Sequence, residues 1–367
     1  MDEEADRGGR ALEPRRRRAV NARGLVSPVA IGLVAVVVAC RGEPQRAEPS
    51  QITPTPPPRA DVVARPQPSP AEVVATVQSP LELAAVGERV FVISSDRFVF
   101  EIDDGGDAKR VANAPPIEMV SGIIGGRDAL WLLAYPLVPA GTAPRPLSTV
   151  VDGRSLWRIP VDGSPATEVA NDVTSIVAAG DRLVLVRGRE ASLRETNGSE
   201  RPLGSIGERY QVHLTAANRD ALFVARGTTL FRVPFDGSGE RVVGALPTPL
   251  GGLAVDDQFA YSSGDGGVVA IALADGTSTV RAHDLADPRA LAVDGKGGVY
   301  VMTYGTFSGW FTERKPNRDG ELLDLEPGQP PVVRAGGFVG AGRVLVTPSA
   351  VLVTDTYGHR VLRARTS

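Results

Sequence analysis

From residue 81 onward, short apolar runs alternate with turn residues at a regular interval. Similar segments of the type Leu-Ala-Val-Asp recur at spacings of 38, 39 and 38 residues, beginning at Ile176, Leu214, Leu253 and Leu291. Each segment is followed by a turn and by a run with alternating apolar positions, for example 259–263, which is the pattern of a β-strand. Self-similarity at this period is typical of repeat architectures. The pattern therefore predicts an all-β repeat of short strands.

A second match identifies the third strand of the repeat and its turn. The octapeptide Leu156–Gly163 recurs as Leu230–Gly237, displaced by 74 residues, or two repeats. Both end in Asp-Gly, which favours a tight turn because Gly tolerates positive φ and Asp can bond its own backbone. Residues 81–367 number 287, so seven units would average 41 residues, as in propeller blades of about 40 to 50 residues. We predict a seven-bladed β-propeller of four-stranded blades, bounded at 81–116, 117–173, 174–211, 212–249, 250–287, 288–336 and 337–367.

The last blade offers only three strands, so we expect its fourth strand to come from the other end of the chain. The segment Glu72–Val77 precedes the first blade just as Lys109–Val111 precedes the second. We predict that Glu72–Val77 pairs with blade seven and closes the ring. A strand of this length adds about five ladder hydrogen bonds at roughly 1 kcal/mol each. The opening segment of each repeat is rich in Ala and Gly, which suits innermost strands where blades converge.

The first forty residues have the pattern of an export signal. Arg15–Arg18 and Arg23 precede an apolar run, Leu25–Ala39, of 15 residues. That order is typical of a secretory signal, and the run is shorter than the about 20 residues of a membrane-spanning helix, which is the alternative. The residues Val37 to Cys40 resemble the lipobox of bacterial lipoproteins. This resemblance implies that residues 1–39 are a signal peptide and that Cys40, the only Cys in the chain, is lipidated. The alternative is an incidental or buried thiol.

The residues after Cys40 have the composition of a spacer. Residues 41–70 hold nine prolines in 30 residues and no aromatic residue, a composition that cannot bury enough apolar surface to fold. We therefore predict three parts: the signal peptide 1–39, a lipidated Cys and disordered linker at 40–70, and a propeller at 71–367. The expected location is the bacterial cell envelope. The resemblance to lipoproteins further implies the outer membrane, because Arg41 and not Asp follows the Cys.

Charge and composition exclude some partners. The chain has 40 Lys and Arg against 43 Asp and Glu, a net charge of −3, so no basic surface is available for a nucleic-acid backbone. A single Cys excludes an internal disulfide. The expected partners are the membrane, through the lipid, and a protein or polysaccharide.

Two segments resemble known propeller families. Residues Asp287–Asp294 together with Val299–Val301 look like a blade of the YWTD propellers, although the YWTD tetrad itself is absent. Residues Val353–Val361 are similar to the NHL repeat. Each match covers one blade. The resemblance implies an NHL-like or YWTD-like propeller, and it implies a fold much more than a function.

Two blades carry insertions that make one face of the ring the candidate binding surface. The insertions are roughly Tyr135–Arg154 and Tyr304–Asp319, both between the predicted second and third strands, so both should emerge on the same face. The second concentrates aromatic residues in a chain that is only 5% aromatic, and aromatic and Arg side chains are favoured at binding hot spots. The alternative is that these aromatics fold back over the propeller. The candidate ligand-binding residues are Tyr304, Phe307, Trp310, Phe311, Arg314 and Tyr135.

No catalytic or cofactor motif is recognisable. The acidic turn Asp103, Asp104 and Asp107 could bind calcium, but a solvated hairpin explains it better, and His213, His283 and His359 lack ligand spacing. We therefore assign no catalytic residue, metal ligand or cofactor. The favoured function is a non-enzymatic, envelope-anchored binding module for a protein, polysaccharide or small ligand. The alternative is a propeller enzyme of the lactonase, lyase or quinoprotein type with a site in the central channel.

Overall fold

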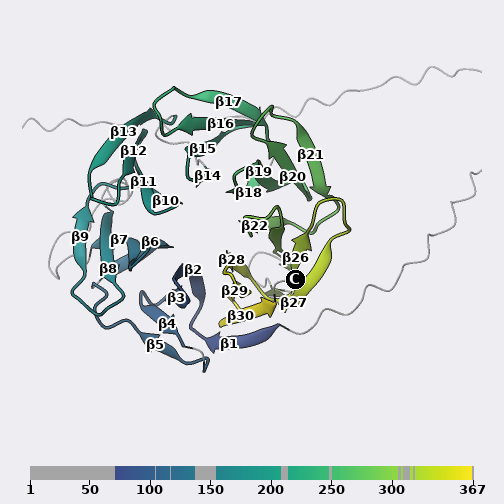
Figure 1. Cartoon of the computed structure of the whole chain (residues 1–367). Coiled ribbons are helices and arrows are strands. Elements are labelled where there is room, and N and C mark those ends of the chain that lie inside the picture. The colour runs from purple at the N-terminus through teal and green to yellow at the C-terminus, as the bar shows by residue number, and fades with distance from the viewer. Residues whose placement is uncertain are drawn as a thin grey trace, which may run out of the picture. The chain divides into compact units, whose positions relative to one another are not determined.

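The computed structural model describes residues 71–103, 105–115, 117–136, 154–207, 214–247, 250–304, 307–308, 315–316 and 319–365. These residues form seven four-stranded antiparallel sheets and one two-stranded sheet. Figure 1 shows the seven sheets arranged as blades around a central axis. The predicted all-β, seven-bladed β-propeller is therefore confirmed.

The strands of blades one to four follow the chain order. Blade one contains β2 (Pro80–Val86), β3 (Arg89–Ser94), β4 (Val99–Ile102) and β5 (Ala108–Arg110), and blade two contains β6 (Ile117–Gly125), β7 (Ala129–Pro136), β8 (Ser155–Pro160) and β9 (Thr167–Ala170). Blade three contains β10 (Ser175–Ala179), β11 (Arg182–Arg187), β12 (Glu190–Arg194) and β13 (Glu200–Ser205), and blade four contains β14 (Thr215–Ala217), β15 (Ala221–Arg226), β16 (Thr229–Pro234) and β17 (Arg241–Ala245).

The remaining blades contain an interruption and the ring closure. Blade five contains β18 (Leu250–Val255), β19 (Phe259–Gly264), β20 (Gly267–Ala272) and β21 (Ser278–Ala282), and blade six contains β22 (Pro288–Val293), β23 (Val299–Thr303), β26 (Gly320–Leu325) and β27 (Val332–Phe338). Blade seven contains β28 (Ala341–Val346), β29 (Ala350–Asp355), β30 (Arg360–Arg365) and β1 (Glu72–Thr76). The short strands β24 (Phe307–Ser308) and β25 (Lys315–Pro316) pair with each other between β23 and β26.

The second strands are buried on both faces over most of their length, so the alternation predicted for segments such as 259–263 is replaced by a continuous run of buried residues. In β15, Leu222 and Val224 pack in the core shared with blade three, whereas Phe223 and Ala225 pack in the core shared with blade five. A strand buried on both faces needs a continuous apolar run, not an alternation with polar residues. This is the local reason why the second strands are the clearest elements of the repeat.

The N-terminal strand closes the ring as predicted. β1 pairs antiparallel with β30, with Val73 opposite Leu362 and Thr76 opposite Arg360. The backbone N–H of Val77 continues this ladder by donating to the carbonyl oxygen of His359 at 3.0 Å. β1 also buries Val74 in a core shared by blades seven and one. Both ladder hydrogen bonds and the burial of apolar side chains therefore stabilise the ring closure.

Small residues allow the innermost strands to approach closely. A Cβ at Gly125 in β6 would collide with the carbonyl oxygen of Ala85 in β2, and a Cβ at Gly252 in β18 would collide with that of Arg289 in β22. The Gly content of the opening segments thus follows from backbone contact between neighbouring inner strands.

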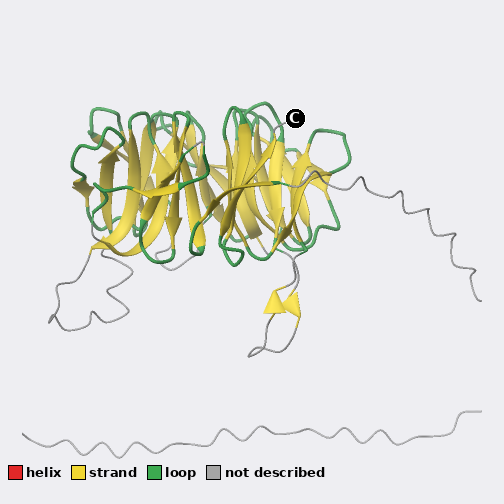
Figure 2. Cartoon of the chain, turned by 90° about the horizontal axis from the view of Figure 1, so that it is seen from below, coloured by secondary structure: helices red, strands yellow, loops and turns green. Residues whose placement is uncertain are grey.

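Both insertions join a second strand to a third strand, as predicted. The connections run from β7 to β8 and from β23 to β26. We call the side of the ring where the second strands end the insertion face. Figure 2 shows the β24–β25 pair beyond the ends of the blade strands on this face. Within the described part of the chain, no helix is long and apolar enough to cross a membrane.

Candidate functional site

A cavity of about 370 Å³ lies on the insertion face beside the ring centre. Its walls come from the first halves of the inner strands β2, β6 and β28 and from the ends of the second strands β3, β23 and β29. Figure 1 shows these inner strands around the middle of the ring. We call this space the mouth cavity. It is lined by Leu81, Glu82, Ile93, Val120, Tyr304, Gly342, Thr356 and Tyr357.

Two tyrosines form the aromatic part of the mouth cavity. The ring of Tyr357 packs against Gly340, where a Cβ would collide with it, yet 54% of the residue surface remains exposed. Tyr304 is half-buried. Burial, followed by the electrostatic influence and hydrogen bonding of Tyr357, raises the pKa of the Tyr304 phenol. The Tyr304 phenol therefore stays protonated at neutral pH and can donate a hydrogen bond.

An ion pair forms the polar wall of the cavity. Arg343 Nε donates to Glu82 Oε2 at 2.8 Å. The Glu82 side chain is 22% exposed and the Arg343 side chain 57%. Burial raises the pKa of the Glu82 carboxyl, although the charge and hydrogen bond of Arg343 act in the opposite direction. Within the described residues, the terminal guanidinium N–H groups of Arg343 and the Oε1 atom of Glu82 have no protein partner, whereas the Arg343 backbone N–H donates to Thr354 Oγ1.

A second ion pair lies next to Tyr304. Arg289 Nε and Asp287 Oδ1 are 2.8 Å apart, and both side chains are at least half exposed. The Arg289 guanidinium carbon lies 6.0 Å from the centre of the Tyr304 ring. Among the described residues, these two acidic and two basic groups beside the mouth cavity are thus paired and balance in charge.

A buried carboxylate holds the loop that carries Tyr357. Asp355 is fully buried, and its Oδ1 accepts hydrogen bonds from the N–H groups of Val339, Gly340 and Gly358 at 3.0 to 3.2 Å. Its Oδ2 accepts one from Arg360 Nε at 2.9 Å. A buried charge needs such a complete set of partners. Asp355 therefore fixes the start of blade seven and the position of Tyr357.

The ring closure also contributes to the cavity wall. Thr356 Oγ1 donates to the carbonyl oxygen of Pro80 at 2.8 Å, and the Ser79 N–H donates to His359 Nδ1 at 2.9 Å. These contacts join the segment after β1 to the loop between β29 and β30. The geometry of the mouth cavity therefore depends on the N-terminal strand.

The residues predicted from the insertions have different positions. Tyr304 lines the mouth cavity. Tyr135 is 7% exposed, and its hydroxyl accepts a hydrogen bond from Arg154 Nε at 2.7 Å. Phe307 belongs to β24, whose side chains are not described. Trp310, Phe311 and Arg314, like Cys40, lie outside the described residues.

Sequence reasoning missed four residues of the site: Glu82, Arg343, Thr356 and Tyr357. They lie at the two ends of the folded region and meet only because the ring closes. The sequence signal that could have found them is their equivalent position within the repeat unit. Glu82, Arg289 and Arg343 lie near the start of inner strands, and Tyr304 and Tyr357 directly follow second strands.

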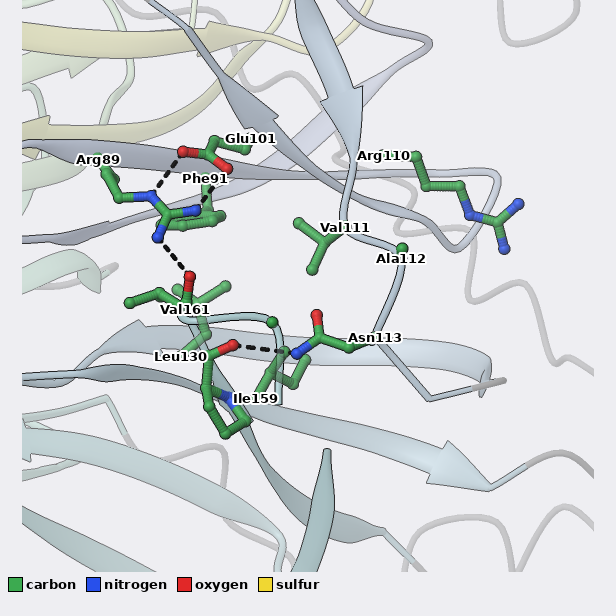
Figure 3. Close-up of a pocket in the computed structure, with 12 residues that line it drawn as sticks. Arg89, Phe91, Glu101, Arg110, Val111, Ala112, Asn113, Leu130, Ile159 and Val161 are labelled. Atoms are coloured by element: carbon green, nitrogen blue, oxygen red, sulfur yellow. Dashed lines mark hydrogen bonds and ion pairs between the residues drawn. The ribbon is translucent and has the colours of Figure 1, made fainter. Parts of the chain in front are cut away.

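A second cavity, of about 380 Å³, lies between blades one and two. Figure 3 shows the Asn113 amide and the Arg89 guanidinium directed at protein partners around it. Arg89 donates to both carboxylate oxygens of Glu101 and to the carbonyl oxygen of Val161, and Asn113 Nδ2 donates to that of Pro160. We call this space the inter-blade cavity. Its polar groups connect the two blades.

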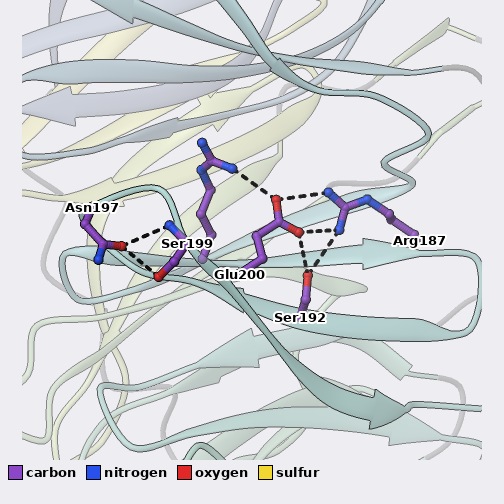
Figure 4. Close-up of polar contacts among 6 residues, drawn as sticks. Arg187, Ser192, Asn197, Ser199 and Glu200 are labelled. Carbon is purple, nitrogen blue, oxygen red and sulfur yellow. Dashed lines mark hydrogen bonds and ion pairs between the residues drawn. The ribbon is translucent and has the colours of Figure 1, made fainter.

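A further polar cluster on the outer strands of blade three is likewise internally satisfied. Figure 4 shows Glu200 between Arg187 and Ser192. Both carboxylate oxygens accept hydrogen bonds, from Arg187 at 2.8 and 3.2 Å, from Arg194 at 3.0 Å and from Ser192 at 3.2 Å. The cluster cross-links β11, β12 and β13.

The remaining titratable candidates have local partners. Asp103 Oδ2 and Lys109 Nζ are 2.7 Å apart, and the Asp107 N–H donates to Asp103 Oδ1, as in a solvated hairpin; Asp104 lies outside the described residues. His283 contacts its neighbour Asp284 at 2.6 Å. Where the structure describes the chain, no group of three or more His, Cys, Asp or Glu residues is arranged to hold a metal ion.

Comparisons with known proteins support the fold and do not name a family. No protein-family model and no curated protein matches the sequence. Among solved structures, virginiamycin B lyase from Staphylococcus aureus is similar with a TM-score of 0.57 and 10% identity, over 80% of this chain and 98% of the lyase. A structure of streptogramin B lyase is similar with a TM-score of 0.54 and 10% identity, over 78% and 93% of the two chains. The WD40 β-propeller domain of Doa1 is similar with a TM-score of 0.55 and 12% identity, over 81% and 97%.

At these identities the likeness shows the fold alone. The class is thus a seven-bladed β-propeller, an architecture that hosts both lyases and WD40 domains among the similar structures. Function must be argued from the site and not from the fold.

Proposed function

We propose that this chain is an envelope-anchored propeller that binds a ligand at its mouth cavity. The observation that carries the proposal is the combination of an exposed Tyr357 with terminal guanidinium N–H groups of Arg343 that have no partner among the described residues. Aromatic and Arg side chains dominate the binding energy of many interfaces. A concave site with a few convergent polar groups is also the usual form of a small-molecule site.

The position of the cavity supports the same function. Both insertions begin and end on the insertion face, and the mouth cavity opens on that face. Loops on a rigid scaffold commonly carry binding residues. A ligand at the mouth would therefore lie on the face where both insertions begin and end.

The anchoring part of the proposal rests on the sequence. An apolar run that ends in Val-Val-Ala-Cys resembles a lipobox, and a Pro-rich segment separates Cys40 from β1. More than one acyl chain gives stable membrane attachment. The linker would hold the propeller away from the bilayer and leave the insertion face free for a partner in the envelope, with the outer membrane as the proposed location.

Anchoring is tested by metabolic labelling with a clickable palmitate analogue and by membrane fractionation of bacteria that express the full chain. We expect the label and the membrane association to be lost in the variant Cys40→Ala. An unlabelled wild-type chain that fractionates away from membranes would contradict the anchor.

Binding is tested by a thermal-shift screen of a metabolite and glycan library with the full chain. We expect ligands that raise the melting temperature of the wild type and not that of the double variant Tyr357→Ala/Arg343→Gln. The control is Arg219→Gln, because Arg219 is 70% exposed and paired with Asp257 but lies in a turn between first and second strands, on the opposite face. Ligands that stabilise the double variant as well as the wild type would contradict the proposal.

The second candidate is an enzyme that uses the same cavity, since two of the structures with a similar fold are lyases and the same architecture can carry such an activity. A lyase or hydrolase would convert the ligand found in the screen. Mass spectrometry of the ligand after incubation with the protein separates the candidates: recovery of unchanged ligand supports a binding module, and a new product that the double variant does not form supports the enzyme.

A further inference from the structure

We infer that the ligand of the mouth cavity is a neutral saccharide. This inference rests on the proposed function, because it names the chemical class that the same cavity would take. Three features of the described residues carry it: an open aromatic ring, donors and acceptors without a partner among these residues, and two ion pairs that balance in charge.

The aromatic feature is the Tyr357 ring. One side of this ring packs against Gly340, while the residue remains 54% exposed. A flat apolar ring that is held from behind can receive the apolar face of a pyranose at small entropic cost. Tyr304, next to it, adds a second aromatic ring, half-buried, to the cavity wall.

The polar feature is the Glu82–Arg343 pair. Only Arg343 Nε is bonded to the carboxylate, at 2.8 Å, so within the described residues the terminal guanidinium nitrogens and Glu82 Oε1 remain open to a ligand. A sugar hydroxyl is both a donor and an acceptor. Neighbouring hydroxyls can therefore donate to Glu82 and accept from Arg343 while the ion pair stays intact.

The charge balance argues against an ionic ligand. Glu82 pairs with Arg343 and Asp287 pairs with Arg289. An anion that approached either Arg would be repelled by the neighbouring carboxylate, and a cation would be repelled by the Arg in the same way. An ionic ligand that displaced one residue of such an ion pair would also leave the displaced charge partly withdrawn from water, which costs desolvation energy. A neutral polyhydroxylated ligand meets neither penalty.

The size of the cavity is consistent with this ligand. A volume of about 370 Å³ lies near the lower end of the about 300 to 1,000 Å³ found for small-molecule sites. The cavity is also partly open to solvent on the insertion face. It can therefore hold one end or one short stretch of a chain whose other units extend outward.

The test is isothermal titration calorimetry of the full chain in detergent with neutral and charged tetrasaccharides. The neutral probes are chitotetraose, cellotetraose and maltotetraose. The charged probes are tetraglucosamine, which is chitotetraose without its acetyl groups, and tetragalacturonate. We expect at least one neutral probe to bind, with the charged probes weaker by about tenfold or more.

Four variants locate the binding. For the neutral probe, Tyr357→Ala and Arg343→Gln should each weaken binding by about tenfold. Tyr357→Phe keeps the ring and should stay within about threefold of the wild type. Arg219→Gln, on the opposite face, should leave the affinity unchanged. An unaltered thermal melt of each variant shows that it is folded.

The outcomes separate this inference from the proposed function. If no neutral probe binds, or if a charged probe binds more tightly and requires Tyr357, the saccharide class is wrong while the mouth cavity remains a binding site. If neutral probes bind and Tyr357→Ala has no effect, the inference is wrong about the site. If, in addition, no ligand of the library screen depends on Tyr357 or Arg343, the proposed function is wrong as well.

Discussion

The mouth cavity and the inter-blade cavity have nearly the same volume, about 370 and 380 Å³, but their arginines are used differently. In the inter-blade cavity, Arg89 is bonded through Nε, Nη1 and Nη2 to Glu101 and Val161. In the mouth cavity, Arg343 is bonded to Glu82 through Nε alone. The first arginine connects two blades, whereas the second still has donors to offer. Cavity size therefore does not distinguish a candidate binding site from a space between two packed blades. The number of polar groups that lack a protein partner does.

The largest effect should come from removal of the closing strand, because this change breaks the mouth cavity and spares the inter-blade cavity. A chain that begins at residue 81 loses β1, whose Val74 is buried, and also loses the Pro80 carbonyl that accepts from Thr356. We expect a loss of about 5 kcal/mol in stability and no ligand binding at the mouth. Thermal melts and calorimetry measure the two effects.

The matched control for this truncation is a deletion of residues 41–70, which leaves β1 in place. It should melt as the wild type does. Equal melting temperatures for the control and for the chain that begins at residue 81 would contradict the role of β1.

The next largest effect should come from Asp355→Asn. This change leaves Arg360 without its buried counter-charge, which should cost about 3 kcal/mol, and it loosens the loop that carries Tyr357. Chemical denaturation measures the loss, and calorimetry should show weaker binding at the mouth. Asp324→Asn is the comparison, because Asp324 is also buried (2% exposed) and paired with an arginine, Arg334. Asp324 lies in blade six and does not belong to the loop that carries Tyr357. It should lower stability but not affinity.

A smaller effect distinguishes the carboxylates of the two cavities. The hydrogen bond from Arg89 lowers the pKa of Glu101 below its ordinary value of 4.5. The resulting stabilisation is present above the unfolded pKa and is lost as the pH falls through the folded pKa. Glu101→Gln should therefore destabilise the protein by up to about 1 kcal/mol at pH 7, and the difference should disappear in denaturation curves recorded near pH 3. A difference that persists unchanged at that pH would refute the assignment.

The smallest effect, of opposite sign, belongs to Glu82. Burial raises the pKa of its carboxyl, so the associated stabilisation is present at acid pH and is lost as the pH rises through the folded pKa. Glu82→Gln should leave the protein as stable as the wild type at pH 7, or more stable by less than about 1 kcal/mol, and relatively less stable near pH 4. Denaturation at the two pH values checks the sign. Ligand affinity should still fall, because the Gln side chain replaces an ionic acceptor.

The fold could be predicted from sequence because each blade repeats one local solution. Leu156–Gly163 and Leu230–Gly237 include β8 and β16, the third strands of blades two and four, so their Asp-Gly turns recur for the same geometric reason. Glu72–Val77 was identifiable because blade seven lacked a strand. These inferences need only the local sequence pattern and a count of the strands that each blade requires.

The site could be predicted only in part. Tyr304 stood out because it begins an aromatic-rich insertion, and Tyr135 because it begins the other, yet Tyr135 is buried against Arg154. Which of two similar tyrosines is exposed depends on packing between blades. Glu82 and Arg343 are 261 residues apart, and no local pattern connects them. Their pairing follows from the closure of the ring.

The most direct test of the central claim is hydroxyl-radical footprinting of the full chain by mass spectrometry, with and without a saturating ligand from the screen. Our account predicts that oxidation of Tyr357 falls at least severalfold while the peptide that contains Ala112 and Asn113, at the inter-blade cavity, is unchanged. Protection at Ala112 and Asn113 with no change at Tyr357 would contradict it.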